Sequence, residues 1–141
     1  MFILDSDHIS IIQLHTAPHF ALVLQRMAQH SQTDFFVTIV SFHEQILGWN
    51  SYIARATDSS GIVRGYTKLE GILADFSASQ VLPFDAAAVD VFDDLRQQRV
   101  RIGTMDLRIA SIALANGMTV LTRNLVDFQR VPNLQVEDWT Q

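Results

Sequence analysis

The chain has 141 residues, of which 48% are hydrophobic and 18% charged, and its formal net charge is −5. These totals are typical of an ordinary soluble globular chain, and we expect one domain spanning residues 1–141. No apolar run reaches the ~18 residues that a membrane span needs, and the N-terminus lacks the pattern of a signal peptide. The absence of cysteine excludes disulfides and thiolate metal sites. We therefore expect no membrane partner and, by default, a cytoplasmic location.

The acidic net charge argues against an unaided hold on a phosphate backbone, because nucleic-acid-binding proteins usually carry a basic face. Segregated charge would still allow such a partner. Lys68 is the only lysine, so almost all cations are arginines, which bind phosphate bidentately and stay charged when partly buried. Arg96, Arg99 and Arg101 lie close together and form either a local basic patch or a solvated helix end.

The first part of the chain alternates apolar runs with helical patterns. Residues 2–5 (FILD) predict a short buried strand, and a helix is expected from about Asp7. Residues 17–30 predict a second helix with Pro18 in its first turn. The apolar and β-branched residues 35–40 (FFVTIV) predict a second strand.

The middle of the chain is mainly helical by its pattern. A helix is expected from Ser41, because apolar residues recur at helical spacing after it. Residues 58–61 (DSSG) are the strongest loop signal here, and a helix over 62–78 is expected to follow. Residues 81–84 (VLPF) predict a short strand.

The last part of the chain carries clear helix boundary signals. Asp85 is expected to cap a helix over residues 86–98. Thr104 is expected to cap a largely buried helix that ends at Gly117, a residue type favoured just past helix C-termini. Two further strands are expected, TVLT (119–122) and LQVED (134–138).

The alternation of short apolar strands with helices predicts an α/β fold with a mostly parallel central sheet, covered by helices on both faces. In such sheets, ligands bind beyond the carboxyl ends of the strands. Asp5 ends the first predicted strand, while Thr122 and Asn124 lie at or just past the end of TVLT. The sequence therefore places polar side chains at the edge where sites usually form.

Four acids are expected near this edge, each after a strand or in the first turn of a helix: Asp5, Glu44, Asp106 and Asp127. Each also has a local explanation. Either Asp5 or Asp7 can cap the first helix. Glu44 completes a Ser-x-x-Glu capping box that starts at Ser41. Asp106 suits the positive end of a helix dipole, and Asp127 suits a turn.

Several carboxylates in one dry cleft repel each other and raise one another's pKa values, and a bound cation offsets that cost. Oxygen ligands without cysteine suit a hard ion such as Mg²⁺ or Mn²⁺. Such an ion activates water and stabilises the charge that develops in phosphodiester cleavage. His8 and His43 flank the acids, and each is expected either to enter the cleft or to be packed and hydrogen-bonded.

Four stretches with this order of acids resemble the PIN-domain family, and within it the VapC-type toxins of bacterial toxin–antitoxin pairs. They are MFILDSDHIS (1–10), VSFHEQILGW (40–49), IGTMDLRIASIALANG (102–117) and TVLTRNLVDFQRVPNLQVEDW (119–139). The resemblance implies a PIN-like α/β/α sandwich over residues 1–141. It also implies a Mg²⁺- or Mn²⁺-dependent endoribonuclease that cleaves RNA with a metal-activated water.

Carried over residue by residue, the family's acidic quartet falls on Asp5, Glu44, Asp106 and Asp127. The resemblance makes Asp5 and Asp106 the strongest metal ligands, while Glu44 completes or orients the site. Asp127 is expected to bind a second ion or to hold a ligand water. Thr122 and Asn124 are expected to orient Asp5 or a phosphate.

The resemblance also implies two partners besides RNA: a small antitoxin whose C-terminal segment blocks the cleft, and a second copy of the toxin in a homodimer. The chain departs from the family at Asp7, where asparagine is frequent. Asp7 therefore either adds a fifth acid or caps a helix.

Three alternatives stay open. ILDSDH also resembles the Asp-x-Asp start of haloacid-dehalogenase-type phosphohydrolases, and receiver-type signalling domains also place acids at strand ends. Both classes need a late lysine, whereas Lys68 lies mid-chain. The third alternative is a PIN-like module that has lost catalysis and only binds proteins.

Overall fold

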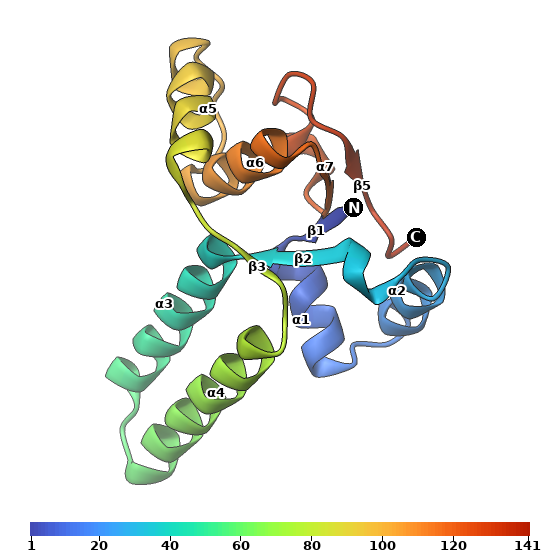
Figure 1. The fold of residues 1–141 in the computed structure, drawn as a ribbon. Coiled ribbons are helices and arrows are strands. Elements are labelled where there is room, and N and C mark those ends of the chain that lie inside the picture. The colour runs from blue at the N-terminus through green and yellow to red at the C-terminus, as the bar shows by residue number, and fades with distance from the viewer.

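A five-stranded sheet runs through the centre of the computed structural model, which describes residues 1–141 (Figure 1). Its order is β3-β2-β1-β4-β5, and all strand pairings are parallel. The strands are β1 (Phe2–Leu4), β2 (Phe35–Thr38), β3 (Val81–Leu82), β4 (Thr119–Leu121) and β5 (Val136–Glu137). The expected mostly parallel sheet is confirmed, although each strand is shorter than its predicted range.

Seven α-helices and a short 3₁₀ helix, η1, connect the strands. They are α1 (Ser6–Leu14), α2 (His19–Met27), η1 (Gln32–Asp34), α3 (Ile39–Arg55), α4 (Ser59–Ser77), α5 (Ala86–Gln97), α6 (Thr104–Asn116) and α7 (Leu125–Phe128). Figure 1 shows α5, α6 and α7 on one side of the sheet and α1, α2 and α4 on the other. This arrangement is the expected α/β/α sandwich.

Two hydrophobic cores hold the layers together, and β1 contributes to both because successive strand side chains point to opposite faces. Ile3 belongs to the core that includes Leu95 of α5 and Ile109 of α6. Leu4 belongs to the core that includes Val23 of α2 and Ile72 of α4. The short run FIL is therefore apolar throughout, as a strand covered on both faces requires.

The helix α6 is the most buried helix of the fold, as its apolar sequence predicts. Its inner residues Ile109, Ala110, Ile112 and Ala113 are completely buried. Gly117 follows its last turn in the left-handed conformation, with φ 63°, which glycine adopts without the steric cost of a Cβ. The predicted C-terminal cap is confirmed.

Several predicted boundaries are wrong by a few residues. The second strand ends at Thr38, and Thr38 caps α3 by accepting a hydrogen bond from the backbone N–H of Ser41. Ser41 therefore lies inside the helix, and the predicted capping box with Glu44 does not form. Glu44 lies in the second turn of α3 rather than the first.

The predicted loop over 58–61 is also wrong, because α4 already begins at Ser59. Asp58 caps α4, and its Oδ1 accepts a hydrogen bond from the N–H of Gly61 at 2.8 Å. The cap of α6 is Gly103 rather than Thr104. Asp85 caps α5 as predicted, by accepting a hydrogen bond from the N–H of Ala88 at 3.1 Å.

The helices α3 and α4 form an antiparallel pair that projects from the sheet, at the lower left of Figure 1. They pack against each other along their length. None of the helices has the length and apolar character needed to traverse a lipid bilayer.

Candidate active site

The expected acids lie at the carboxyl edge of the sheet. Asp5 follows β1 directly, and its backbone N–H donates to the carbonyl of Leu121 on β4 at 3.0 Å. Its side chain is 6% exposed. Oδ1 accepts a hydrogen bond from the N–H of Ser6 at 2.8 Å, and Oδ2 accepts one from the hydroxyl of Thr122 at 2.9 Å. Asp5 is therefore both the N-cap of α1 and a fixed carboxylate.

Asn124 links the two late acids, one on α6 and one on α7. Its amide nitrogen donates to Oδ2 of Asp127 at 3.0 Å and lies 3.4 Å from Oδ2 of Asp106. Its backbone N–H donates to the hydroxyl oxygen of Thr122 at 3.0 Å. Thr122 and Asn124 therefore connect Asp5 to the late acids. Asp127 lies in the short helix α7 rather than in the turn that was the local alternative for this residue.

Glu44 reaches the same site from α3. Its Oε1 accepts a hydrogen bond from the hydroxyl of Ser6 at 3.1 Å. Ser6 is a residue that the sequence reasoning missed. Its position between Asp5 and Asp7 was the available signal, because a hydroxyl there lies at the same sheet edge as the acids.

Asp7 has a different role from the helix cap that was one of its two predicted roles. Its Oδ2 accepts a hydrogen bond from the backbone N–H of Arg123 at 2.8 Å and lies 3.3 Å from the hydroxyl of Thr122. Its Oδ1 lies 2.8 Å from Nδ1 of His8. Asp7 therefore connects the segment after β4 to the start of α1, while Asp5 is the N-cap of α1.

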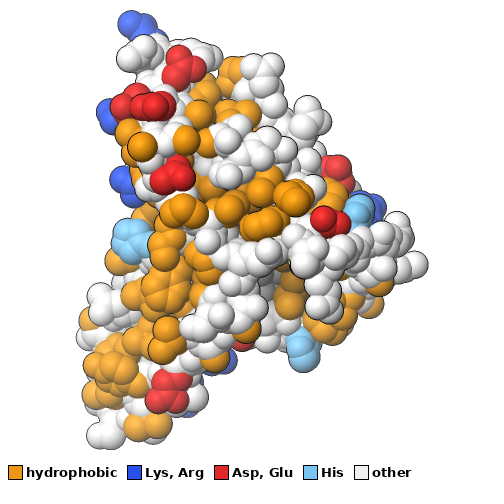
Figure 2. Space-filling model, viewed as in Figure 1, with side chains coloured by type: hydrophobic (Ala, Val, Ile, Leu, Met, Phe, Trp, Pro, Cys, Tyr) orange, Lys and Arg blue, Asp and Glu red, His pale blue; other side chains and the backbone are white.

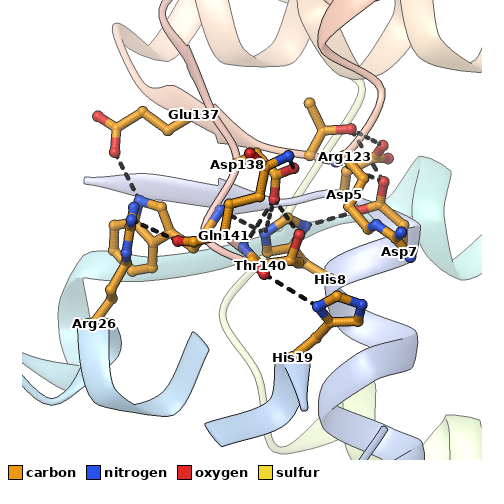
Figure 3. A network of polar contacts seen from close by, with 12 residues as sticks. Asp5, Asp7, His8, His19, Arg26, Arg123, Glu137, Asp138, Thr140 and Gln141 are labelled. Atoms are coloured by element: carbon orange, nitrogen blue, oxygen red, sulfur yellow. Dashed lines mark hydrogen bonds and ion pairs between the residues drawn. The ribbon is translucent and has the colours of Figure 1, made fainter. Parts of the chain in front are cut away.

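His8 is completely buried and takes the packed, hydrogen-bonded role of its two alternatives (Figure 3). Its Nε2 accepts a hydrogen bond from the backbone N–H of Trp139 at 3.3 Å. Nδ1 must then carry the ring proton and donate it to Asp7. His8 thereby joins the C-terminal segment to the acidic site. His43, the other flanking histidine, is exposed on α3.

Burial and mutual repulsion make ionisation of the acids in this site unfavourable. Burial, with repulsion from Asp7 and Asp106, raises the pKa of Asp5 to about 7. Burial and repulsion from Asp127 and Asp7 also raise the pKa of Asp106. The pKa of Glu44 is raised by burial and by Asp106. Three acids are thus held in an environment that favours protonation or a neighbouring cation.

Asp7 is the exception within the site. Burial alone would raise its pKa, but the hydrogen bonds from His8 and from the N–H of Arg123 outweigh burial and lower it. A carboxylate that accepts several hydrogen bonds keeps its charge. Asp7 therefore stays ionised to a lower pH than an ordinary aspartate and places a negative charge beside Asp5.

The donor set fits a hard divalent cation. All available ligands are carboxylate, hydroxyl or amide oxygens, and three of the carboxylates carry a repulsion that a cation would relieve. No three His, Asp or Glu side chains converge on one point in the structure. An ion such as Mg²⁺ does not require that convergence, because it keeps several waters and uses one or two protein carboxylates.

The lysine needed by two of the alternative classes is not at this site. Lys68 is exposed on α4, where its Nζ lies 5.9 Å from the centroid of the Trp49 ring. It packs within the α3–α4 pair instead of following a late strand. The phosphohydrolase and receiver alternatives therefore lack their lysine.

A parallel sheet between two helical layers, with carboxylates at its carboxyl edge, is the architecture expected of a PIN-like α/β/α protein. No protein-family model matches the chain. The chain is 30% identical over 143 aligned residues to the tRNA(fMet)-specific endonuclease VapC of Shigella flexneri, and the alignment covers 99% of this chain and 98% of the relative. The chain therefore belongs to the VapC family.

One further relative and one solved structure are similar to the chain, the structure in its fold. The chain is 37% identical over 67 residues to Ribonuclease VapC2 of Rickettsia felis, an alignment that covers 45% of this chain and only 50% of the relative. The structure of VapBC-1 from nontypeable Haemophilus influenzae matches the fold with a TM-score of 0.75 and 23% identity, over 99% of this chain and 98% of that chain.

Proposed function

We propose that the protein is a metal-dependent endoribonuclease, the toxin of a type II toxin–antitoxin pair, acting in the cytoplasm as one domain over residues 1–141. The observation that carries the proposal is the cluster of repelling carboxylates at the carboxyl edge of the sheet. The Shigella flexneri relative is named as a tRNA-specific endonuclease, and the Rickettsia felis relative as a ribonuclease. These names support RNA as the substrate class.

We assign the direct metal ligands to Asp5 and Asp106. Glu44 completes or orients the site, and Asp127 holds a second ion or a ligand water. When bound, Mg²⁺ or Mn²⁺ would neutralise the acids, polarise a phosphate and lower the pKa of a water. The two metals share this oxygen chemistry, so the assignment covers both.

The protein's own contribution is to hold the carboxylates in place before substrate arrives. The hydroxyls of Ser6 and Thr122 each donate to one carboxylate, which fixes Glu44 and Asp5. Asn124 does the same for Asp127. Asp7 holds the backbone that carries Thr122 and Asn124. Such pre-orientation lowers the reorganisation needed during the reaction.

The central prediction concerns the buried carboxylate at the end of β1. Asp5→Asn keeps the size and the helix cap of Asp5 but removes a charged ligand, so we expect cleavage to fall by at least ~100-fold. Wild type and variant are compared on total cellular RNA with Mg²⁺, Mn²⁺ or EDTA. Wild type is expected to give discrete fragments with metal and none with EDTA.

Asp58→Asn is the matched control. Asp58 caps α4, a helix that contributes no residue to the acidic site, and asparagine also caps helices well. Its cleavage should equal that of wild type. Thermal melts provide a second readout, since Mg²⁺ should stabilise wild type and Asp58→Asn but stabilise Asp5→Asn less. Equal cleavage by wild type and Asp5→Asn would refute the assignment of the site.

We also propose an antitoxin partner and a homodimer. The Haemophilus influenzae structure is of VapBC-1, and VapBC is a family of toxin–antitoxin systems, which supports a protein partner for this chain. Light scattering of the purified chain tests the dimer, and co-expression with a small neighbouring reading frame tests the antitoxin. A monomer that captures no such partner would contradict both assignments.

A further inference from the structure

An open hollow of ≈ 940 Å³ lies beside the acidic site, between α5, α6 and the segment after α7. Half of the chain's basic residues line it: Arg96, Arg99, Arg101, Arg108 and Arg130. Asp127 is the one acid in its wall. Because Asp127 also accepts a hydrogen bond from Asn124, the hollow and the acidic site share a boundary.

The guanidinium groups of this hollow are mostly without acidic partners. Only Arg130 forms an ion pair, with Oδ1 of Asp127 at 3.7 Å. Arg96 lies over the ring of Phe92, and Arg108 contacts the sulfur of Met105. A protein with a net charge of −5 thus leaves four cations unneutralised in one place. The positive electrostatic potential is therefore concentrated in the hollow. Such a local basic surface is what an acidic protein needs in order to bind a nucleic acid.

The loop between α5 and α6 carries a further sign that an arginine is needed there. Arg99 adopts the left-handed conformation, with φ 60°, just past the end of α5. Glycine or asparagine would fit this position with less strain. An arginine in such a conformation points to a role for the side chain beyond ending the helix.

Figure 2 shows cationic side chains at the end and along the edge of α5, next to acidic ones on the same helix. The acids of α5 do not line the hollow. The arginines therefore line the hollow toward α6 and the acidic site, while the acids of α5 lie outside it.

We propose that this arginine hollow binds the phosphates of an RNA single strand and leads the strand to the carboxylates. The inference rests on the proposed ribonuclease function and names the surface that receives its substrate. A polyanion that approaches five carboxylates is repelled, so a neighbouring cationic surface is needed to hold it. Guanidinium groups match phosphate oxygens bidentately, so arginines at this surface suit a phosphate backbone.

An acidic peptide is the competing ligand for a cationic hollow. RNA is favoured because the hollow shares Asp127 with a site suited to phosphodiester cleavage. A strand lying in the hollow would continue directly to the carboxylates. An acidic peptide has no phosphodiester bond to be cleaved, so the proximity of the hollow to the carboxylates would not favour its binding.

The test measures binding separately from cleavage. The Asp5→Asn protein, which is not expected to cut, is titrated into a short fluorescein-labelled RNA at several KCl concentrations, with anisotropy as the readout. The same protein carrying Arg99→Gln and Arg101→Gln should bind about 25-fold more weakly at about 0.1 M salt, since each lost phosphate contact costs about fivefold there. The slope of log affinity against log salt should fall by about 0.7 for each contact.

Arg55→Gln in the same background is the matched control, because Arg55 is an exposed arginine at the end of α3 and does not line the hollow. It should bind as the parent does. With Asp5 restored, the protein carrying Arg99→Gln and Arg101→Gln should cleave RNA with a higher KM than wild type and a nearly unchanged kcat.

Three outcomes are informative. Unchanged RNA binding by the double arginine variant would overturn the inference, even if wild type cleaves RNA. Arginine-dependent binding of a glutamate-rich peptide without RNA binding would also overturn it. Arginine-dependent RNA binding by a chain that never cleaves RNA would support this surface and refute the proposed ribonuclease.

Discussion

Asp5 combines structural and chemical demands in one residue. Its backbone joins β1 to β4, its Oδ1 caps α1, and its Oδ2 is held by Thr122. Burial and the neighbouring acids nevertheless make its ionised form unfavourable. A residue optimised for stability alone would not keep a charge here, so the cost is a sign of function.

The raised pKa of Asp5 predicts how stability depends on pH without metal. The pKa is about 7 in the fold against a reference of 3.8, so the folded state binds more protons than the unfolded state between these values. The contribution of Asp5 to stability is therefore full below pH 3.8, falls as pH rises toward about 7, and is level above that. Asp5→Asn lacks this loss, and at neutral pH or above it should be more stable than wild type, by at most ~4 kcal/mol.

Urea unfolding in EDTA at several pH values measures this difference. The stability gap between Asp5→Asn and wild type should widen from acid to neutral pH and then stay constant. Asp93→Asn serves as the control, since Asp93 is exposed on α5 and its side chain forms no ion pair. A gap that does not change with pH would mean that burial does not shift the ionisation of Asp5.

At the scale of elements, the contact between α3 and α4 depends on one glycine. Gly65 is buried on α4, and a Cβ there would collide with Cγ1 of Ile53 on α3 and lie 3.1 Å from its Cδ1. A second glycine on the same helix, Gly71, is exposed and has open space at its Cβ position. The two positions therefore differ in packing but share a helical backbone.

These two glycines form a matched pair for a stability measurement. Gly65→Ala should lower the free energy of unfolding by about 1–3 kcal/mol, because the added methyl forces the two helices apart. Gly71→Ala should raise it by about 0.5–1 kcal/mol, because alanine favours the helical backbone more than glycine does. Chemical denaturation of both variants measures the effects. Equal changes for both would show that the close contact does not constrain the pair.

The element boundaries show where sequence patterns mislead. FFVTIV is a continuous apolar run, so it predicts a strand through residue 40, yet α3 begins at Ile39. Thr38 and Ser41 both carry a hydroxyl suited to a helix cap, and the local pattern does not choose between them. The short pairing of β2 with β3 ends at Thr38, and that tertiary limit sets the boundary.

At the scale of the whole molecule, the C-terminal segment fastens the fold. Trp139 is 3% exposed and lies against Phe2, His30 and Phe35, with ring centroids 4.9, 5.6 and 5.9 Å away. Its backbone N–H donates to His8, which holds Asp7. The last residues thereby connect one hydrophobic core to the acidic site (Figure 3).

Trp139→Ala should lower the free energy of unfolding by about 3–5 kcal/mol, because it removes a large buried side chain and leaves a cavity. Trp139→Phe should cost less, since an aromatic ring still fills most of the space. Trp49→Ala is the comparison, because Trp49 is only half-buried on α3. Urea unfolding of the three variants measures the order. A loss at Trp139 no larger than that at Trp49 would argue against a fastening role.

The sequence by itself determined the order of the strands and of the six longer helices, the parallel sheet and the acids expected at its edge. Apolar runs, helical spacing and the carboxyl-edge rule are local or topological signals, so one chain is sufficient to apply them. The buried α6 and the caps at Asp85 and Gly117 follow from the same local chemistry.

Only the tertiary structure decided which groups hold each acid. Ser6 meets Glu44 across 38 positions of the chain, Thr122 meets Asp5 across 117, and Trp139 meets His8 across 131. The gathering of five arginines beside Asp127 is equally a product of packing. These contacts exist because β1 lies between β2 and β4, which brings distant loops to one edge. Hydrogen bonds between such distant residues leave no periodic pattern in the sequence, whereas burial of apolar side chains does.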